Sequence, residues 1–126
     1  MKKVIKSAEA PAAIGPYSQA IEAGPFVFCS GQIALSPDKD APIPGDVNAQ
    51  TEQVMKNIAG VLKAAGLGFQ NVAKTTIFLT DMGDFQTVNE IYGRHFPENP
   101  PARSTVAVAG LPRGVKVEIE VLAVRD

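Results

Sequence analysis

Arg103 is the residue whose type and setting most directly suggest ligand binding. It lies in the segment PPARST at positions 100–105, where two prolines stiffen the approach to a stretch typical of a strand. A guanidinium held at a rigid strand start can bind a carboxylate through two parallel hydrogen bonds. The alternative is a structural ion pair or simple exposure. Spacing alone favours this alternative, because most surface arginines do no chemistry.

Glu118 and Glu120 form the second candidate group. They alternate along an expected strand, so their side chains share one face of the sheet about 7 Å apart. Two carboxylates so placed could run acid–base chemistry, and burial at an interface would raise a carboxyl pKa. The alternative is a solvated or salt-bridged pair beside Lys116, and the sequence alone favours that alternative.

Four further residues could line a pocket. Gly31 follows an expected strand and would let a ligand approach the backbone closely, and Ser30 beside it offers a hydroxyl. Tyr17 could close a pocket with its hydroxyl pointing inward, and Asn89 on an expected helix could contact a ligand. Each also has an ordinary structural interpretation: a strand end with a turn, a packed ring or an exposed helix residue.

Composition argues against several classes of protein. The single cysteine, Cys29, and the single histidine, His95, exclude an internal disulfide and the usual cysteine- or histidine-rich metal sites. No phosphate-binding loop or cofactor signature is present, so we expect neither a metal nor a cofactor. A formal net charge of -1 without a long basic run argues against nucleic acid as the main partner. No stretch approaches the roughly 18 apolar residues that span a bilayer, and a soluble, cytoplasmic protein is expected.

The elements that must position these residues follow from hydrophobic periodicity. The clearest is a helix that begins after the N-cap Asp46 and ends at a C-cap, Gly66. The order predicts an α+β two-layer sandwich, with a mixed sheet of about six strands and two helices on one face, in a single domain over 1–126. Strands are expected at 2–6, 18–22, 26–30, 72–80, 102–108 and 115–124, and helices at 47–65 and 85–96.

The last expected strand has two unlike faces. One face is apolar throughout and suits packing under the helices. The other is half charged and half apolar, which is unusual for solvent and would be explained by a subunit interface, so we predict a homo-oligomer. The apolar face comprises Val115, Val117, Ile119, Val121 and Ala123, and the mixed face Lys116, Glu118, Glu120, Leu122 and Val124.

Taken together, segments spread along nearly the whole chain resemble the Rid (reactive intermediate deaminase) family, also called the YjgF or translation-inhibitor-like family. No single motif is decisive, but the joint match in the right order is specific. The segments lie at 10–20, 30–33, 64–67, 72–82, 85–92, 101–106, 111–112 and 117–120.

The resemblance implies a chorismate-mutase-like α+β fold and a homotrimer with a cleft between each pair of subunits. In each cleft Arg103 would bind the substrate carboxylate, Thr105 would add backbone contacts and Glu118 would hold the attacking water. The pocket would be lined by Tyr17, Ser30, Gly31 and Asn89. Many members carry cysteine where this chain has Thr105, so thiol modification is not available at that position, whereas arginine-based hydrolysis does not require the thiol.

The activity implied by the resemblance is hydrolytic deamination of 2-imino acids and their enamine tautomers, such as 2-aminoacrylate, which PLP-dependent dehydratases release. The products are a 2-ketoacid and ammonia. The alternative is a non-catalytic regulatory module that binds a ketoacid in the same cleft. The charge balance and the lack of paired histidines argue against a ribonuclease. The single assigned cation, Arg103, argues against a chorismate mutase.

Overall fold

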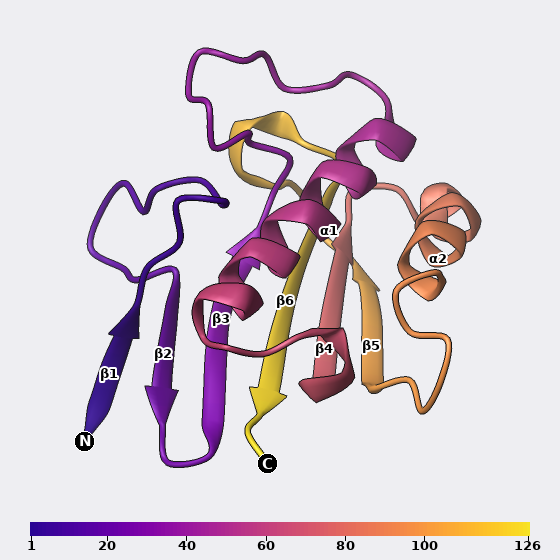
Figure 1. Cartoon of the computed structure of the whole chain (residues 1–126). Helices are drawn as coiled ribbons and strands as arrows, with labels where there is room; N and C mark the ends of the chain where they lie inside the picture. The colour runs from indigo at the N-terminus through magenta and orange to yellow at the C-terminus, as the bar shows by residue number, and fades with distance from the viewer.

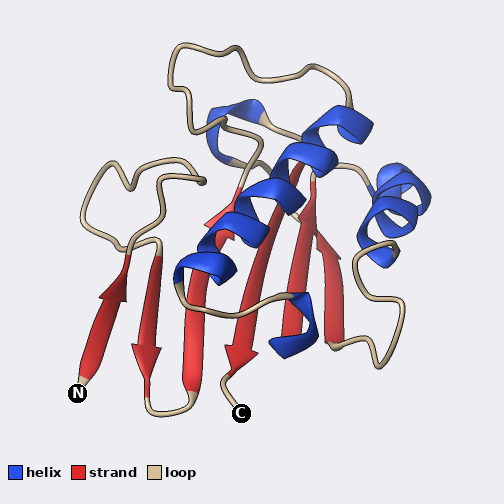
Figure 2. Cartoon of the chain, in the orientation of Figure 1, coloured by secondary structure: helices blue, strands red, loops and turns tan.

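The computed structural model describes residues 1–126 and contains one six-stranded mixed sheet in the order β1-β2-β3-β6-β4-β5. Every neighbouring pair is antiparallel except β4 and β5, which are parallel. Figures 1 and 2 show the long helix and the shorter one on the same side of this sheet, which confirms the predicted α+β architecture. The strands are β1 (Lys2–Ile5), β2 (Ala20–Ala23), β3 (Phe26–Gln32), β4 (Val72–Leu79), β5 (Ala102–Ala107) and β6 (Val117–Val124).

Helix α1 (Val47–Ala64) begins where its sequence predicts and ends one residue earlier. The carboxylate of Asp46 accepts a 2.7 Å hydrogen bond from the Ala49 N–H, which satisfies a donor of the first turn. At the other end Gly66 adopts a left-handed φ of 76°, and the Leu67 N–H donates back to the Leu62 carbonyl. This is a Schellman motif. The cap residue itself is Ala65, so the expected C-cap at Gly66 lies one residue too far along.

The hydrophobic core lies between α1 and the sheet. Val54, Ile58, Val61 and Leu62 recur at helical spacing and are at most 2% exposed. They pack against the apolar face of β6, whose alternation of buried and more exposed residues follows the predicted pattern. The fold therefore rests on the two most regular stretches of the sequence.

Four predicted boundaries are wrong by two residues or more. Strand β2 begins at Ala20 rather than at residue 18. Helix α2 (Phe85–Gly93) stops before residue 96, because the chain tightens after Gly93 into bonds such as His95 N–H to the Tyr92 carbonyl. Strand β3 continues to Gln32, so Gly31 lies inside the strand rather than after it. The pairing of β3 with β6 shifts register there. The last strand begins at Val117 because a 3-10 turn, η3 (Pro112–Gly114), precedes it.

The sheet face opposite the helices is partly apolar. Phe26, Phe28 and Val106 on this face are 42%, 50% and 40% exposed. Strand pairing places Phe28 beside Leu122 and Phe78 beside Glu118, so apolar and charged side chains alternate across it. No helix of the chain is both long enough and apolar enough to cross a membrane.

Candidate functional site

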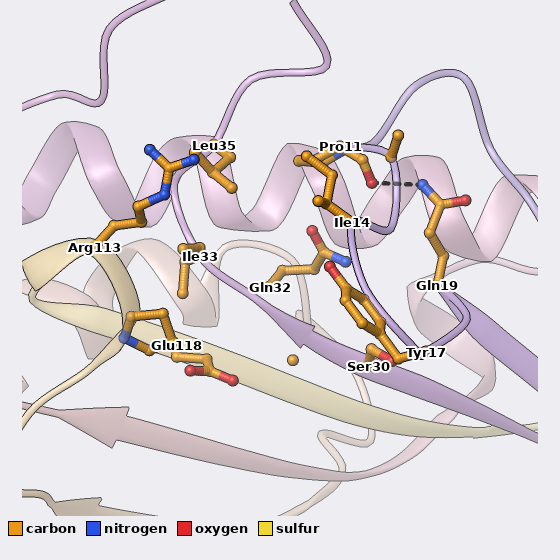
Figure 3. Close-up of a pocket in the computed structure, with 13 residues that line it drawn as sticks. Pro11, Ile14, Tyr17, Gln19, Ser30, Gln32, Ile33, Leu35, Arg113 and Glu118 are labelled. Carbon is orange, nitrogen blue, oxygen red and sulfur yellow. Dashed lines mark hydrogen bonds between the residues drawn. The ribbon is translucent and has the colours of Figure 1, made fainter. Parts of the chain in front are cut away.

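A cavity of about 520 Å³ opens beside β3 and β6, and we call it the carboxylate cavity. Its walls come from the loop before β2, from β3 and the chain after it, from the η3 turn, and from β6 (Figure 3). Four of the residues predicted for the site are among those that line it. The lining residues are Pro11, Ala12, Ile14, Tyr17, Gln19, Ser30, Gly31, Gln32, Ile33, Leu35, Pro112, Arg113 and Glu118.

Glu118 places a carboxylate in this cavity against the backbone of Gly31. A Cβ built on Gly31 would overlap the Glu118 carboxylate, so the absence of a side chain at position 31 makes room for that group. Burial raises the pKa of Glu118, and the negative charge of Glu120 raises it further. A carboxyl group with a raised pKa is suited to accept and return a proton.

Ser30 and Tyr17 contribute differently to the cavity. The Ser30 hydroxyl donates a 2.6 Å hydrogen bond to the Ser18 carbonyl, which leaves its lone pairs as acceptors. Tyr17 is 55% exposed and follows Gly15, whose φ of 119° turns the loop in a way that favours glycine. The two residues lie close together at one end of the cavity in Figure 3.

Gln19 is a buried amide that the sequence analysis did not single out. Its side-chain N–H groups donate to the carbonyls of Ser7 and Pro11 at 3.1 and 2.7 Å, and its oxygen accepts from the Ser7 N–H at 2.7 Å. The first of these carbonyls precedes the loop at 11–17 and the second opens it. Gln19 therefore fixes one wall of the cavity through main-chain contacts.

Asn57 anchors the opposite wall from α1. It is fully buried and donates to the carbonyls of Ile33 and Leu35 at 3.1 and 2.7 Å. The side-chain oxygen of Gln50, two turns earlier on the same helix, accepts a 2.8 Å hydrogen bond from the Lys116 N–H just before β6. The signal in the sequence was two amides inside the apolar stripe of a helix, because a buried polar group there needs a specific partner.

Arg103 is held in a second hollow, which we call the arginine hollow. Its guanidinium lies 5.1 Å from the ring centre of Tyr92 and 5.5 Å from that of Phe85. It donates a 2.6 Å hydrogen bond to the Asn89 side-chain oxygen, while the Tyr92 hydroxyl pairs with Thr75 at 2.7 Å. These contacts orient an exposed arginine whose other donors remain free.

Thr105 lies two residues beyond Arg103 on β5, on the same side of the strand. Its hydroxyl is buried and has no hydrogen-bond partner. A buried hydroxyl without a partner is uncommon and marks this part of the strand as a place where a further group could bind.

A single chain does not bring Arg103 and Glu118 together. Arg103 pairs with the buried Thr75 and so faces α2, whereas Glu118 pairs with Phe78 on the face away from the helices. No residue lines both the arginine hollow and the carboxylate cavity. The arginine hollow is lined by Asn89, Tyr92, Gly93, Phe96, Pro100, Pro101 and Arg103.

The chain therefore provides an oriented cation, Arg103, in the arginine hollow. It provides a carboxyl group with a raised pKa, Glu118, in the carboxylate cavity. Nowhere in the chain do three or more histidine, cysteine, aspartate or glutamate side chains gather as metal ligands would. Cys29 packs in β3 beside the core, and burial raises the pKa of its thiol to about 12, which removes it as a nucleophile.

Fold and site together define an α+β protein with two helices over a six-stranded mixed sheet, an arginine held against two aromatic rings, and a carboxylate cavity. Residues 7–125 match the family described as Endoribonuclease L-PSP, and the chain belongs to this family, which is the Rid/YjgF family that its sequence resembles.

Known relatives cover nearly all of the chain. It is 57% identical to protein DfrA of Myxococcus xanthus, over 98% of this chain and 95% of that protein. It is 50% identical to the mouse protein named 2-iminobutanoate/2-iminopropanoate deaminase, over 99% of this chain and 93% of that protein. A crystal structure from Thermotoga maritima, 46% identical, superposes with a TM-score of 0.96 over 100% of this chain and 99% of that one.

Proposed function

We propose that this protein hydrolyses reactive 2-imino acids and their enamine tautomers, such as 2-aminoacrylate, to 2-ketoacids and ammonia. The observation that carries the proposal is Glu118, a carboxylate with a raised pKa that fills the space left by Gly31 in an open cavity. The mouse relative is 50% identical to this protein over 99% of the chain, and its name supports the same chemistry.

The proposed reaction needs positioning more than a strong nucleophile, because an imine is already an electrophile. Arg103 binds the substrate carboxylate, with Asn89 orienting the guanidinium and the Thr105 backbone adding contacts. Glu118 removes a proton from water as the water oxygen bonds to C2 of the C=N group. The electron pair of the C=N double bond moves to the nitrogen, which takes that proton from the Glu118 carboxyl, and a carbinolamine forms. Glu118 then takes the hydroxyl proton of the carbinolamine and passes it to the nitrogen, so that the C2–N bond breaks, ammonia leaves and the C2 oxygen becomes the ketone. Tyr17, Ser30 and Gly31 form the surrounding wall.

A complete site in this proposal requires two copies of the chain. Arg103 and Glu118 lie on opposite faces of one sheet, so the arginine hollow of one subunit would have to meet the carboxylate cavity of the next. A cyclic homotrimer with three such clefts fits this requirement. It would also cover Phe28 and Val106, which are 50% and 40% exposed in the single chain.

The test couples a PLP-dependent threonine dehydratase to its substrate and adds a trace of this protein. Ketoacid appearance is followed by absorbance while semicarbazide competes for the free imine. We expect faster ketoacid release and less semicarbazone, and we expect Arg103→Ala to abolish both effects while the protein stays folded. Arg94→Ala is the matched control, because that arginine makes only exposed ion pairs with Glu52 and Glu90.

Full activity in Arg103→Ala would refute the proposed role of the arginine. No effect of the wild-type protein on any of several imines would refute hydrolysis altogether. The cleft would then fit a regulatory module that binds a ketoacid, and thermal-shift measurements with ketoacids would test that function.

The single domain over 1–126 and the cytoplasmic location stay predictions of the sequence.

A further inference from the structure

Arg113 is the only cation that lines the carboxylate cavity, and Glu118 is the only acidic residue there. Arg113 is exposed, and none of the four ion pairs of the chain involves Arg113. Its side chain extends from the η3 turn toward Leu35 (Figure 3). A guanidinium without a protein partner at the mouth of a cavity can bind an anionic group of a ligand.

The backbone holds Arg113 in a conformation that a non-glycine residue rarely adopts. Its φ of 61° and ψ of 14° lie in the left-handed region, between Pro112 and Gly114. The turn is closed by the Gly114 N–H, which donates to the Leu111 carbonyl at 3.1 Å. Left-handed conformations of non-glycine residues persist where the surrounding structure fixes them, and they concentrate at ligand sites.

The cavity is also larger than a short imino acid needs. In the single chain its volume is about 520 Å³, in the range of pockets that hold drug-sized ligands. Ile33 and Leu35 add an apolar wall to the same cavity. A longer substrate could therefore place its methylene groups along this wall and its far end at Arg113.

We propose that Arg113 determines specificity by binding a second carboxylate, so that the cleft also accepts 2-imino acids with an acidic side chain. This inference rests on the proposed imine hydrolysis and names a substrate class for it. Arg103 takes the carboxylate next to C2, and Arg113 takes the carboxylate at the end of the side chain. Arg113 touches substrate only when the side chain is long and anionic.

The test compares two imines generated in place by flavin amino-acid oxidases, one from glutamate and one from norvaline, which lacks the second carboxylate. We expect Arg113→Ala to lower kcat/KM for the glutamate imine about tenfold, mainly through KM, since one exposed charge-assisted bond is lost. The norvaline imine should change less than about twofold. Arg113→Lys should recover most of the loss, because the charge is kept.

Lys56→Ala is the matched control, because Lys56 is an exposed cation of helix α1, on the other side of the sheet from Glu118, and lines neither the carboxylate cavity nor the arginine hollow. It should leave both imines unchanged. Equal effects of Arg113→Ala on the two imines, or no effect on either, would overturn the inference.

A failure of the proposed hydrolysis would look different, because the wild-type protein would then act on neither imine. In that case calorimetric titration with 2-ketoglutarate and 2-ketovalerate makes the same comparison by binding. A selective loss of 2-ketoglutarate affinity in Arg113→Ala would support the role of Arg113. Unchanged affinities for both acids would overturn it.

Discussion

The Glu118 carboxylate lies in the space where a side chain at Gly31 would be, so these two residues on neighbouring strands are complementary in shape. The contact joins the irregular part of β3 to β6 and fixes where the carboxylate can lie. Position 31 thereby controls the proposed base without taking part in the reaction.

Gly31→Ala should displace the Glu118 carboxylate and lower kcat for imine hydrolysis by more than about tenfold, because a small misplacement of a catalytic group is costly. The protein should remain folded, since Gly31 has no positive φ to lose. The coupled dehydratase assay measures the rate, and circular dichroism checks the fold. Gly110→Ala is the control, because a Cβ there would meet nothing. Wild-type kcat in Gly31→Ala would show that the carboxylate position does not limit the reaction.

The pH profile should carry the signature of Glu118. Its raised pKa means that the ionised base is lost as pH falls through a value above that of an ordinary glutamate, so kcat/KM should decline on that acidic limb. Glu120→Gln removes the second cause of the raised pKa and should move the limb to lower pH. Glu98→Gln, an exposed carboxylate in another part of the chain, should leave the limb in place. An unmoved limb in Glu120→Gln would contradict the assignment.

The same raised pKa affects stability with a definite sign. The folded protein holds the Glu118 proton more tightly than the unfolded chain, so the contribution of this group is most favourable below the unfolded pKa. That contribution falls as pH rises from the unfolded toward the folded pKa. Urea unfolding across this window should show the free energy of unfolding of the wild type declining relative to that of Glu118→Gln as pH rises. A constant difference between the two proteins would contradict the raised pKa.

Asn57→Ala should lower the free energy of unfolding by about 2–3 kcal/mol, because two buried carbonyls lose their donors. It should also raise KM, since the wall at Ile33 and Leu35 loses its anchor. Urea titration gives the first quantity and steady-state kinetics the second. Asn48→Ala changes an exposed asparagine of the same helix and should alter stability by less than about 0.5 kcal/mol. An unchanged free energy of unfolding in Asn57→Ala would show that these two hydrogen bonds do not anchor the wall.

Cys29 should resist alkylation in the native protein. Burial raises its thiol pKa to about 12, so almost no thiolate is present near neutral pH. Mass spectrometry after iodoacetamide treatment should show labelling in urea and none in buffer within the same time. Rapid native labelling would mean that β3 opens frequently.

The regular elements were predictable because their signals are local. Helix α1 and strand β6 carry long hydrophobic patterns that only one element type satisfies, and Glu118 was found from the same alternation. The end of β3 was not predictable, because it depends on a register shift against β6, which lies far along the chain. Residue types could not reveal that Arg103 and Glu118 face opposite sides either, since this follows from how β5 pairs with β4.

The roles of Gln19, Asn57 and Arg113 also escaped sequence reasoning. The two amides act on carbonyls that lie between 8 and 24 residues away, and only the folded chain defines those pairs. Arg113 has the sequence context of an ordinary turn, and its left-handed backbone is set by the neighbouring η3 geometry.

Asn57 donates hydrogen bonds only to the main-chain carbonyls of Ile33 and Leu35, so these bonds do not depend on the side chains at positions 33 and 35. Selection could therefore exchange the apolar groups at both positions, and with them the substrates that fit, while the backbone of the wall stays in place. The substrate range can thus change without a change in the fold. Directed evolution of the enzyme can begin at these two positions.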